Sequence, residues 1–483
     1  MKTTKNKMNT KIQFTLTAIL VLAINIIYAQ KVNVIYTTPN ERWVEAKKVA
    51  KTEKSGDVAD ITVYTDEKLQ VIDGVGGAFN ELGWTAIQAL PKEKQNEIFK
   101  ALFSEDGCNF SMCRIPLGAS DYALSYYSSN DVPKDFAMRD FNIDRDKFIL
   151  IPYIKEALKV RPDLMVWASP WSPPAWMKVN EHYGMSSGEF GNAVDGNRMD
   201  EGAQIFNNAT AFKMQERYLK AYALYFSKFV QAYNKEGVPL FAIQPQNEVA
   251  FQPNWPSCTW RPEDMAYFIG EFLGPQFEKD NLDAEIWLGT VNAGNPQYVR
   301  TILEHKTAQK YITGVGFQWG GAKSIPTINK EFKNIKLMQT ENKCGEHEND
   351  WTSVERSWKD MMHYIGNGAG SYMYWNMILD ETGKSAWGWP QNSMVVIDSK
   401  SKEVTYTDEF YLFKHLSHFV QPGDHLLKSE GENVLAFELE NGRIMMMVYN
   451  PEETRKTINV KVGENTMSAD LQPTSISSVI INK

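Results

Sequence analysis

Two glutamates each end an apolar stretch of this chain. Glu248 closes the stretch LFAIQPQNE, and Glu341 lies near the end of IKLMQTENKCG. A carboxylate at the end of a buried strand is costly unless a neighbouring group uses it. Two carboxylates flanking a glycosidic bond are the minimum for its hydrolysis by double displacement: one attacks the anomeric carbon, while the other protonates the leaving oxygen and then activates water. The pair therefore points to glycoside chemistry, provided that the fold brings the two side chains together.

The elements that must position these glutamates form an alternating pattern. Apolar strand patterns occupy residues 74–79, 111–118, 164–171, 240–248, 284–294, 312–321, 335–345 and 370–377. Amphipathic segments with a period of 3.6 residues lie between them. Eight strands alternating with helices predict a (β/α)8 barrel, with an open doubly wound sheet as the alternative. The first stretch, GVGGAF, lacks the GxGxxG spacing that such a sheet usually has after its first strand, which favours the barrel.

The segments outside the barrel pattern complete the expected organisation. We expect a signal peptide at residues 1–30, N-terminal strands at 31–73, the barrel at 74–420 and a β domain at 421–483. The last part alternates in short strands with a hairpin signal at ENGR. Because a small sheet gains stability from further strands, the N-terminal strands are expected to join it. The predicted fold is α/β, a (β/α)8 TIM barrel with a side antiparallel β-sandwich domain built from both termini.

The N-terminus has the pattern of an export signal. Lysines up to Lys11 precede the apolar run FTLTAILVLAINIIYAQ, which is short for a membrane span and ends near the small residue Ala29. This predicts a signal peptide cleaved near Ala29 or Gln30, and a retained anchor helix is the alternative. We expect a periplasmic or secreted protein with no stable membrane association.

The composition narrows the possible partners. The chain has 483 residues and a formal net charge of −8, which argues against nucleic acid and anionic membranes, since both favour basic patches. Its 14 tryptophans suit sugar stacking, although a large core accounts for that number on composition alone. The four cysteines, 108, 113, 258 and 344, lack zinc-site spacing and are expected to be mostly buried thiols of open disulfide state. No metal or cofactor is predicted, and the oligomeric state is not determined by the sequence.

Function in such a barrel lies at the C-terminal ends of the strands. Besides the two glutamates, those ends and their loops place on one rim the candidate residues Arg114, Asp121, Trp171, Asn247, Gln318, Trp319 and Trp375. Indole rings offer the faces on which a sugar stacks. Arg114 is expected to keep Glu341 ionised, because a nearby opposite charge lowers the pKa of a carboxylate. Glu248, followed by the apolar residues VAF, is expected to have a raised pKa and to hold a proton.

Structural roles are the alternatives for several of these side chains. For Glu341 the alternative is a simple ion pair with Lys343 or Arg114. Asp121 has the type of side chain that caps a turn, and Trp171 the type that packs in a core. The paired placement of the two glutamates favours the chemical interpretation.

Several motifs are similar to those of glycoside hydrolase family 30, which includes glucosylceramidases, β-1,6-glucanases and related β-glycosidases. They are GVGGAFNE, MCRIPLGASDYALSYYSSND, ASPWSPPAWMK, PQNE, MQTEN, YMYWNM and GWPQNSMVVID, spread over essentially the whole mature chain. The resemblance implies a retaining enzyme with Glu248 as acid/base and Glu341 as nucleophile. It also implies that Asn247 contacts the sugar 2-hydroxyl or the nucleophile.

The resemblance further implies that Asp121, Trp171 and Trp375 line the glycone subsite, which favours a β-glucosyl unit. One departure affects the leaving-group side: Gln318, Trp319 and Gly320 stand where glucosylceramidase-like members have His-Trp-Tyr. The expected substrate is a β-1,6-linked glucan or gluco-oligosaccharide. The alternatives are a glucosylceramidase-type β-glucosidase, a β-xylosidase or a non-catalytic carbohydrate-binding barrel. The exact linkage, the aglycone and exo or endo action stay open.

Overall fold

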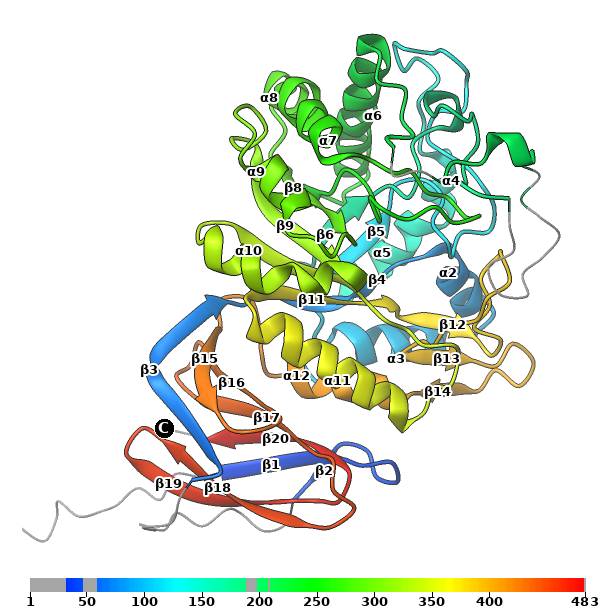
Figure 1. Cartoon of the computed structure of the whole chain (residues 1–483). Coiled ribbons are helices and arrows are strands. Elements are labelled where there is room, and N and C mark those ends of the chain that lie inside the picture. The colour runs from blue at the N-terminus through cyan, green and yellow to red at the C-terminus, as the bar shows by residue number, and fades with distance from the viewer. Residues whose placement is uncertain (1–31, 47–58, 188–196, 198, 207–208, 482–483) are drawn as a thin grey trace, which may run out of the picture.

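The computed structural model describes residues 32–46, 59–187, 197, 199–206 and 209–481, so the expected signal peptide lies outside the described residues. Eight parallel strands close into a barrel in the order β10-β11-β4-β5-β6-β7-β8-β9 (Figure 1). In chain order, β4 to β11 span Gly74–Ala78, Met112–Pro116, Met165–Ser169, Leu240–Ile243, Glu285–Val291, Ile312–Gln318, Lys336–Asn342 and Ala369–Asn376. Each strand falls within one of the predicted stretches or within one residue of it. The predicted (β/α)8 barrel is confirmed, and the open sheet is wrong.

Helices surround the barrel strands (Figure 1). They are α2 (Glu81–Gln88), α3 (Lys92–Phe103), α4 (Asp144–Phe148), α5 (Leu150–Val160), α6 (Glu216–Lys235), α7 (Pro262–Phe268), α8 (Gly274–Lys279), α9 (Gln297–Leu303), α10 (Ile325–Glu331), α11 (Trp351–Gly366) and α12 (Asp408–Ser417). Shorter helical turns are η1 (Ala175–Met177), η2 (Glu201–Ala203), η3 (Ile269–Leu273) and η4 (Trp319–Lys323). In α6, Leu219, Tyr222, Phe226 and Phe229 are buried at the spacing of one helix face.

The barrel interior is layered. Met112, Trp167, Trp287, Met338 and Met373 belong to one buried apolar cluster that fills the lower part of the barrel. Side chains two positions apart in a strand point to the same side. The next layer toward the C-terminal ends of the strands therefore contains the residues two positions after those of the apolar cluster. From β5, β6, β10 and β11 that layer receives Arg114, Ser169, Thr340 and Trp375. The change from an apolar to a polar layer forms the floor of the site.

A second sheet is built from both ends of the chain. Its nine strands run in the order β19-β18-β3-β15-β16-β17-β20-β1-β2. The N-terminal strands are β1 (Val32–Thr37), β2 (Val44–Glu45) and β3 (Ile61–Val71). The C-terminal strands are β15 (His425–Glu430), β16 (Val434–Glu438), β17 (Ile444–Asn450), β18 (Lys456–Val462), β19 (Asn465–Leu471) and β20 (Ser475–Ile481). The pairs are antiparallel except β18 with β3, which is parallel. The predicted side domain from both termini is confirmed.

This β domain has its own apolar core and lies against the barrel (Figure 1). His415 of α12 forms hydrogen bonds with Ser478 of β20 at 2.8 Å and Thr37 of β1 at 2.9 Å. A further three-stranded sheet, β12 (Ile378–Asp380), β13 (Val395–Ile397) and β14 (Val404–Tyr406), follows the last barrel strand. The loop between β12 and β13 reaches the rim of the barrel.

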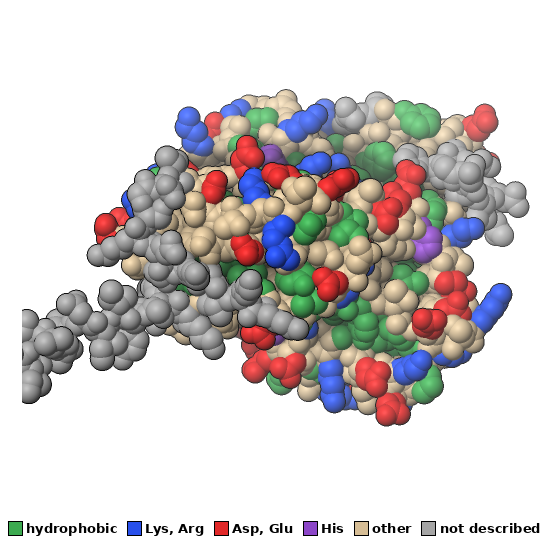
Figure 2. Space-filling model, turned by 90° about the horizontal axis from the view of Figure 1, so that it is seen from below, with side chains coloured by type: hydrophobic (Ala, Val, Ile, Leu, Met, Phe, Trp, Pro, Cys, Tyr) green, Lys and Arg blue, Asp and Glu red, His purple; other side chains and the backbone are tan. Residues whose placement is uncertain are grey.

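The surface carries charged side chains of both signs (Figure 2). On the face shown in Figure 2, acidic and basic side chains are interspersed. Within the described residues, no helix has the length and apolar character needed to cross a membrane. All four cysteines are buried and unpaired, as the sequence predicts for buried thiols.

Candidate active site

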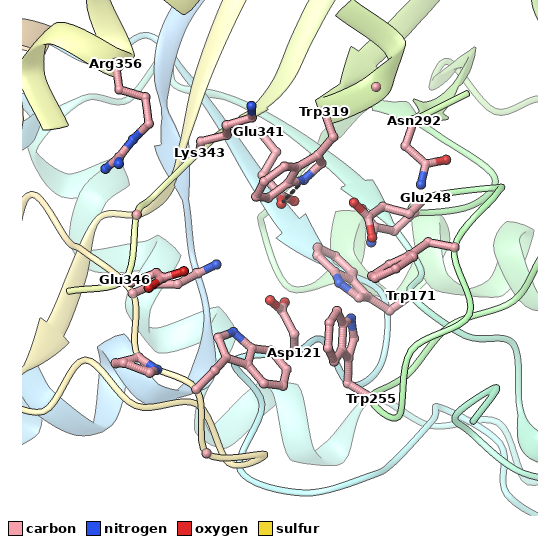
Figure 3. A pocket seen from close by; sticks show the side chains of 18 of the residues that line it. Asp121, Trp171, Glu248, Trp255, Asn292, Trp319, Glu341, Lys343, Glu346 and Arg356 are labelled. Atoms are coloured by element: carbon pink, nitrogen blue, oxygen red, sulfur yellow. Dashed lines mark hydrogen bonds between the residues drawn. The ribbon is translucent and has the colours of Figure 1, made fainter. Parts of the chain in front are cut away.

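The C-terminal ends of the strands surround a cavity of about 840 Å³. Six of the nine predicted residues line it, namely Asp121, Trp171, Asn247, Glu248, Trp319 and Glu341. Figure 3 shows the carboxylates of both glutamates directed into this one cavity. Arg114, Gln318 and Trp375 lie behind the lining and contact it from below. The fold therefore brings together the two carboxylates that the sequence placed on separate strands.

Glu341 is held by hydrogen bonds to both of its carboxylate oxygens. Arg114 Nη1 donates to one oxygen at 2.8 Å, and Trp319 Nε1 donates to the other at 3.1 Å. The register between β9 and β10 shifts between Gln339 and Glu341. Such an irregularity re-aims a side chain, which here turns Glu341 toward the cavity. The expected contact with Arg114 is present, and the ion pair of Glu341 is with Arg114 rather than Lys343.

The pKa of Glu341 differs from the expectation in its net direction. Burial raises the pKa, while Arg114 and the hydrogen bond from Trp319 lower it. Arg114 alone would lower the pKa, but desolvation penalises the charged form and is the larger effect. Glu341 is still the carboxylate that a cation contacts directly, so it is the more readily ionised of the two.

Glu248 has the environment of an acid that keeps its proton. Burial, followed by the charge of Glu341, raises the pKa of Glu248 to about 8, as the sequence predicts in direction. Its carboxylate accepts a hydrogen bond from Gln318 Nε2 at 3.3 Å. Its backbone adopts a left-handed conformation with φ of 51°, which is uncommon for a residue with a side chain. The Glu248 amide donates to the Thr290 carbonyl at 3.1 Å, which holds this conformation after β7 ends.

The guanidinium of Arg114 connects the two sides of the site. It is fully buried, and its Nη2 donates to Asn247 at 2.7 Å and to Ser169 at 2.9 Å. The Cζ atom of Arg114 lies 4.3 Å from the centre of the Trp171 ring, which is a cation–π contact. Arg114 thus fixes Asn247 and Trp171 relative to Glu341.

Asn247 uses its oxygen entirely within the protein. Besides Arg114, the hydroxyl of Thr290 donates to Asn247 Oδ1 at 3.0 Å and Gln318 Nε2 donates to it at 3.2 Å. These donors fix the orientation of the amide, so its Nδ2 is the group that can reach a ligand in the cavity. Asn247 meets Glu341 through Arg114, and its predicted contact with a sugar stays a prediction.

Asp121 and Trp375 are both buried at the site. Asp121 lines the cavity and has one buried oxygen with no hydrogen-bond partner among the described residues. Burial and the charges of Glu341 and Glu248 raise its pKa. Trp375 is 1% exposed and packs against Trp171, with ring centres 4.9 Å apart. It packs against the ring of Trp171, and its predicted contact with a sugar stays a prediction.

Sequence reasoning missed the aromatic side of the cavity. Phe251, Trp255 and Trp389, called here the tryptophan wall, line it from the loops after β7 and β12. The ring centres of Trp255 and Trp389 are 4.2 Å apart, and those of Phe251 and Trp255 are 5.6 Å apart. For Trp389, the abundance of aromatic residues after Met377 was the available signal. Loop residues beyond the strand ends have no periodicity from which their direction can be predicted.

A closed parallel barrel that directs two glutamates of different pKa into a sugar-sized cavity defines a glycoside hydrolase. Residues 72–420 match the glycosyl hydrolase family 30 TIM-barrel domain, and the chain belongs to this family. The predicted family, the enzyme class and a carbohydrate as substrate are thereby confirmed.

Individual relatives cover most of the chain. This chain is 27% identical over 427 residues to putative glucosylceramidase 1 of Caenorhabditis elegans, and the matched region covers 83% of this chain and 76% of that protein. It is 24% identical over 428 residues to the endo-1,6-beta-D-glucanase of Neurospora crassa, which covers 82% of each chain. The solved structure of the endo-beta1,6-glucanase BT3312 is similar with a TM-score of 0.77 and 25% identity, covering 94% of this chain and 100% of that one.

Proposed function

We propose that the protein is a retaining β-glycosidase that hydrolyses β-glucosidic linkages of β-1,6-linked glucan or gluco-oligosaccharides. The observation that supports this most is the unequal environment of two carboxylates in one cavity. The carboxylate of Glu341 accepts from a buried arginine, whereas that of Glu248 accepts from the side-chain amide of Gln318. Double displacement needs this asymmetry: an ionised group to attack carbon and a protonated group to release the leaving oxygen.

The proposed reaction has two steps. Glu341 attacks the anomeric carbon while Glu248 gives its proton to the leaving oxygen. Bonding to the sugar removes the negative charge of Glu341, which is one of the causes of the raised pKa of Glu248. The pKa of Glu248 then falls, and its carboxylate can take a proton from the water that releases the sugar. One residue thus serves as acid and then as base.

The substrate proposal rests on the relatives and on the cavity. Several proteins similar to this chain in sequence or in structure are named endo-1,6-glucanases. The unpartnered oxygen of Asp121 suits a sugar hydroxyl as donor, because buried polar groups are normally hydrogen-bonded. The tryptophan wall adds stacking faces for a further sugar unit.

A glucosylceramidase-type β-glucosidase is the second candidate, favoured by the similarity to putative glucosylceramidase 1. The presence of both Glu248 and Glu341 in the cavity argues against a non-catalytic binding barrel.

Turnover on a panel of substrates tests the substrate proposal. We expect the highest kcat/KM on β-1,6-linked gluco-oligosaccharides, lower values on β-1,3- and β-1,4-linked ones, and activity on aryl β-glucosides. An aryl β-xyloside and glucosylceramide in detergent are the comparisons for the alternatives. A preference for glucosylceramide or for the xyloside would replace the proposed substrate, and no hydrolysis of any glycoside would contradict the reaction itself.

The pH profile of kcat/KM should fall on its alkaline side near pH 8. Glu248 must be protonated to release an alcohol, and its pKa is raised to about 8, so the reactive fraction decreases as the pH rises through that value. For an oligosaccharide we expect a loss of about tenfold per pH unit above it. An aryl glucoside with an acidic phenol needs little protonation and should lose less. An equal decrease of kcat/KM above pH 8 for both substrates would contradict the role of Glu248 as acid.

We further propose export of the protein with cleavage near Ala29 or Gln30, supported by the lysines and the apolar run that precede it. The mature protein is then expected outside the cytoplasm, starting at Gln30 or Lys31. N-terminal sequencing of the exported material measures this. A protein that starts at Met1 in an integral-membrane fraction would instead establish a retained anchor.

A further inference from the structure

Lys178 closes the motif ASPWSPPAWMK, and the proposed reaction does not use it. Its side chain is fully buried. The ammonium donates to the carbonyl oxygens of Tyr183 at 2.7 Å, Gly184 at 3.1 Å and Ser257 at 2.6 Å. An ammonium group has three N–H bonds, so these carbonyls occupy all of them. Burial lowers the pKa of Lys178 to about 7. The three carbonyl oxygens accept from the ammonium, and hydrogen bonds to a charged group favour its charged form.

The three carbonyls belong to two different loop segments. Residues 183–186 follow η1, and residues 253–258 lie between β7 and α7. The segments also bond to each other directly, because the Met185 amide donates to the Pro253 carbonyl at 2.9 Å. A Cβ atom at Gly184 would lie 2.8 Å from the carbonyl oxygen of Asn254, so the two backbones are in close contact. Lys178 lies at this joint and bonds to both segments.

The second segment brings Trp255 to the cavity. Trp255 lines the cavity two residues before Ser257, whose carbonyl Lys178 holds (Figure 3). Its ring packs against Trp389 at 4.2 Å between ring centres. The position of the backbone of residues 253–258 therefore determines where the ring of Trp255 lies relative to a bound sugar.

We propose that Lys178 is a positioning residue for substrate binding: its ammonium joins the two segments and sets Trp255 against the sugar. A buried charge is costly, and a structural link between loops does not require one. What the ammonium supplies is three directed bonds from one point to two segments that lack regular strand pairing. The inference rests on the proposed function for the identity of the ligand, but not on the roles of the two glutamates.

The test measures binding instead of turnover, in a Glu341→Gln background. The probe is β-1,6-linked glucotetraose, and the dissociation constant is measured by calorimetry. Lys178→Met keeps an unbranched side chain, shorter by one atom, but removes its charge and donors. We expect it to weaken binding about tenfold, and Trp255→Ala to weaken it by at least as much. The double variant should bind no more weakly than Trp255→Ala alone, because Lys178 acts through Trp255.

An unchanged dissociation constant for Lys178→Met, or losses that add in the double variant, would overturn the proposal. If Lys178→Met does not fold, Gly184→Ala tests the same joint: its Cβ presses on the Asn254 carbonyl and displaces Gly184, whose own carbonyl the ammonium holds. Weaker binding that disappears in the Trp255→Ala background supports the proposal, and unchanged binding overturns it. If the parent protein does not bind the tetraose, the substrate proposal fails, and the same cycle is measured with the best substrate of the panel.

Discussion

Glu341→Ala should abolish turnover of every substrate, with a loss of roughly 10⁵-fold or more in kcat, as expected when the attacking group of a covalent mechanism is removed. The variant leaves the buried Arg114 without its carboxylate partner, so stability is measured alongside activity by thermal unfolding. Added azide should restore part of the activity. It attacks from the face that Glu341 vacates and should give the α-glycosyl azide.

Two controls separate chemistry from folding in this experiment. Glu341→Gln keeps the shape of the side chain and can still accept from Arg114, and it should be as inactive as Glu341→Ala. Glu346 also lines the cavity but is exposed, and Glu346→Ala should keep its activity within about twofold of the parent. Substantial activity in both Glu341 variants would contradict the assignment.

Glu248→Ala should show a different pattern that depends on the leaving group. With an oligosaccharide, kcat/KM should fall by about 10³-fold, because proton transfer to the leaving alcohol is lost. With an activated aryl glucoside, formation of the glycosyl–enzyme survives, but its breakdown is slow since no base activates water. Azide needs no base, so it should accelerate breakdown and give the β-glycosyl azide.

The stereochemistry of the azide product distinguishes the two glutamates. An α product from the Glu248 variant would mean that the roles of Glu248 and Glu341 are exchanged. The alkaline limb near pH 8 should also be absent from the residual activity of Glu248→Ala, because the titrating group is gone. Full activity of the variant toward oligosaccharides would show that another group supplies the proton.

The barrel and its rim were accessible from the sequence because strand patterns have clear ends. Glu248 and Glu341 each follow an apolar stretch, and closure of the barrel brings the ends of β7 and β10 to one cavity. The sequence did not reveal how Glu341 is aimed, since that depends on a local irregularity between β9 and β10. It also did not reveal the depth of Trp375, because the whole of β11 is buried and its residue pattern does not show how far below the cavity this ring lies.

The loops were less predictable than the strands, and so was the balance of charge and burial. Trp255 and Trp389 come from irregular segments, where only the packed structure decides which side chains turn inward. The expected pKa of Glu341 was too low because the sequence shows the cation, Arg114, but not the extent of burial. Lys178 was visible in the sequence as part of a motif, yet its partners are backbone carbonyls, which sequence patterns do not identify.

The central claim is that Glu341 forms a covalent bond to the sugar. The test uses an activated 2-deoxy-2-fluoro-β-glucoside. Its fluorine slows both steps of the reaction, while its good leaving group keeps the first step fast enough for the glycosyl–enzyme to accumulate. Mass spectrometry of the digested protein then locates the bound sugar. We predict one fluoroglucosyl group, on the peptide that contains Glu341 and on that residue, with release of the sugar on addition of an acceptor. Label on Glu248 would exchange the two roles, and an enzyme that stays unlabelled while it releases the α-anomer as its first product from ordinary β-glucosides would contradict double displacement.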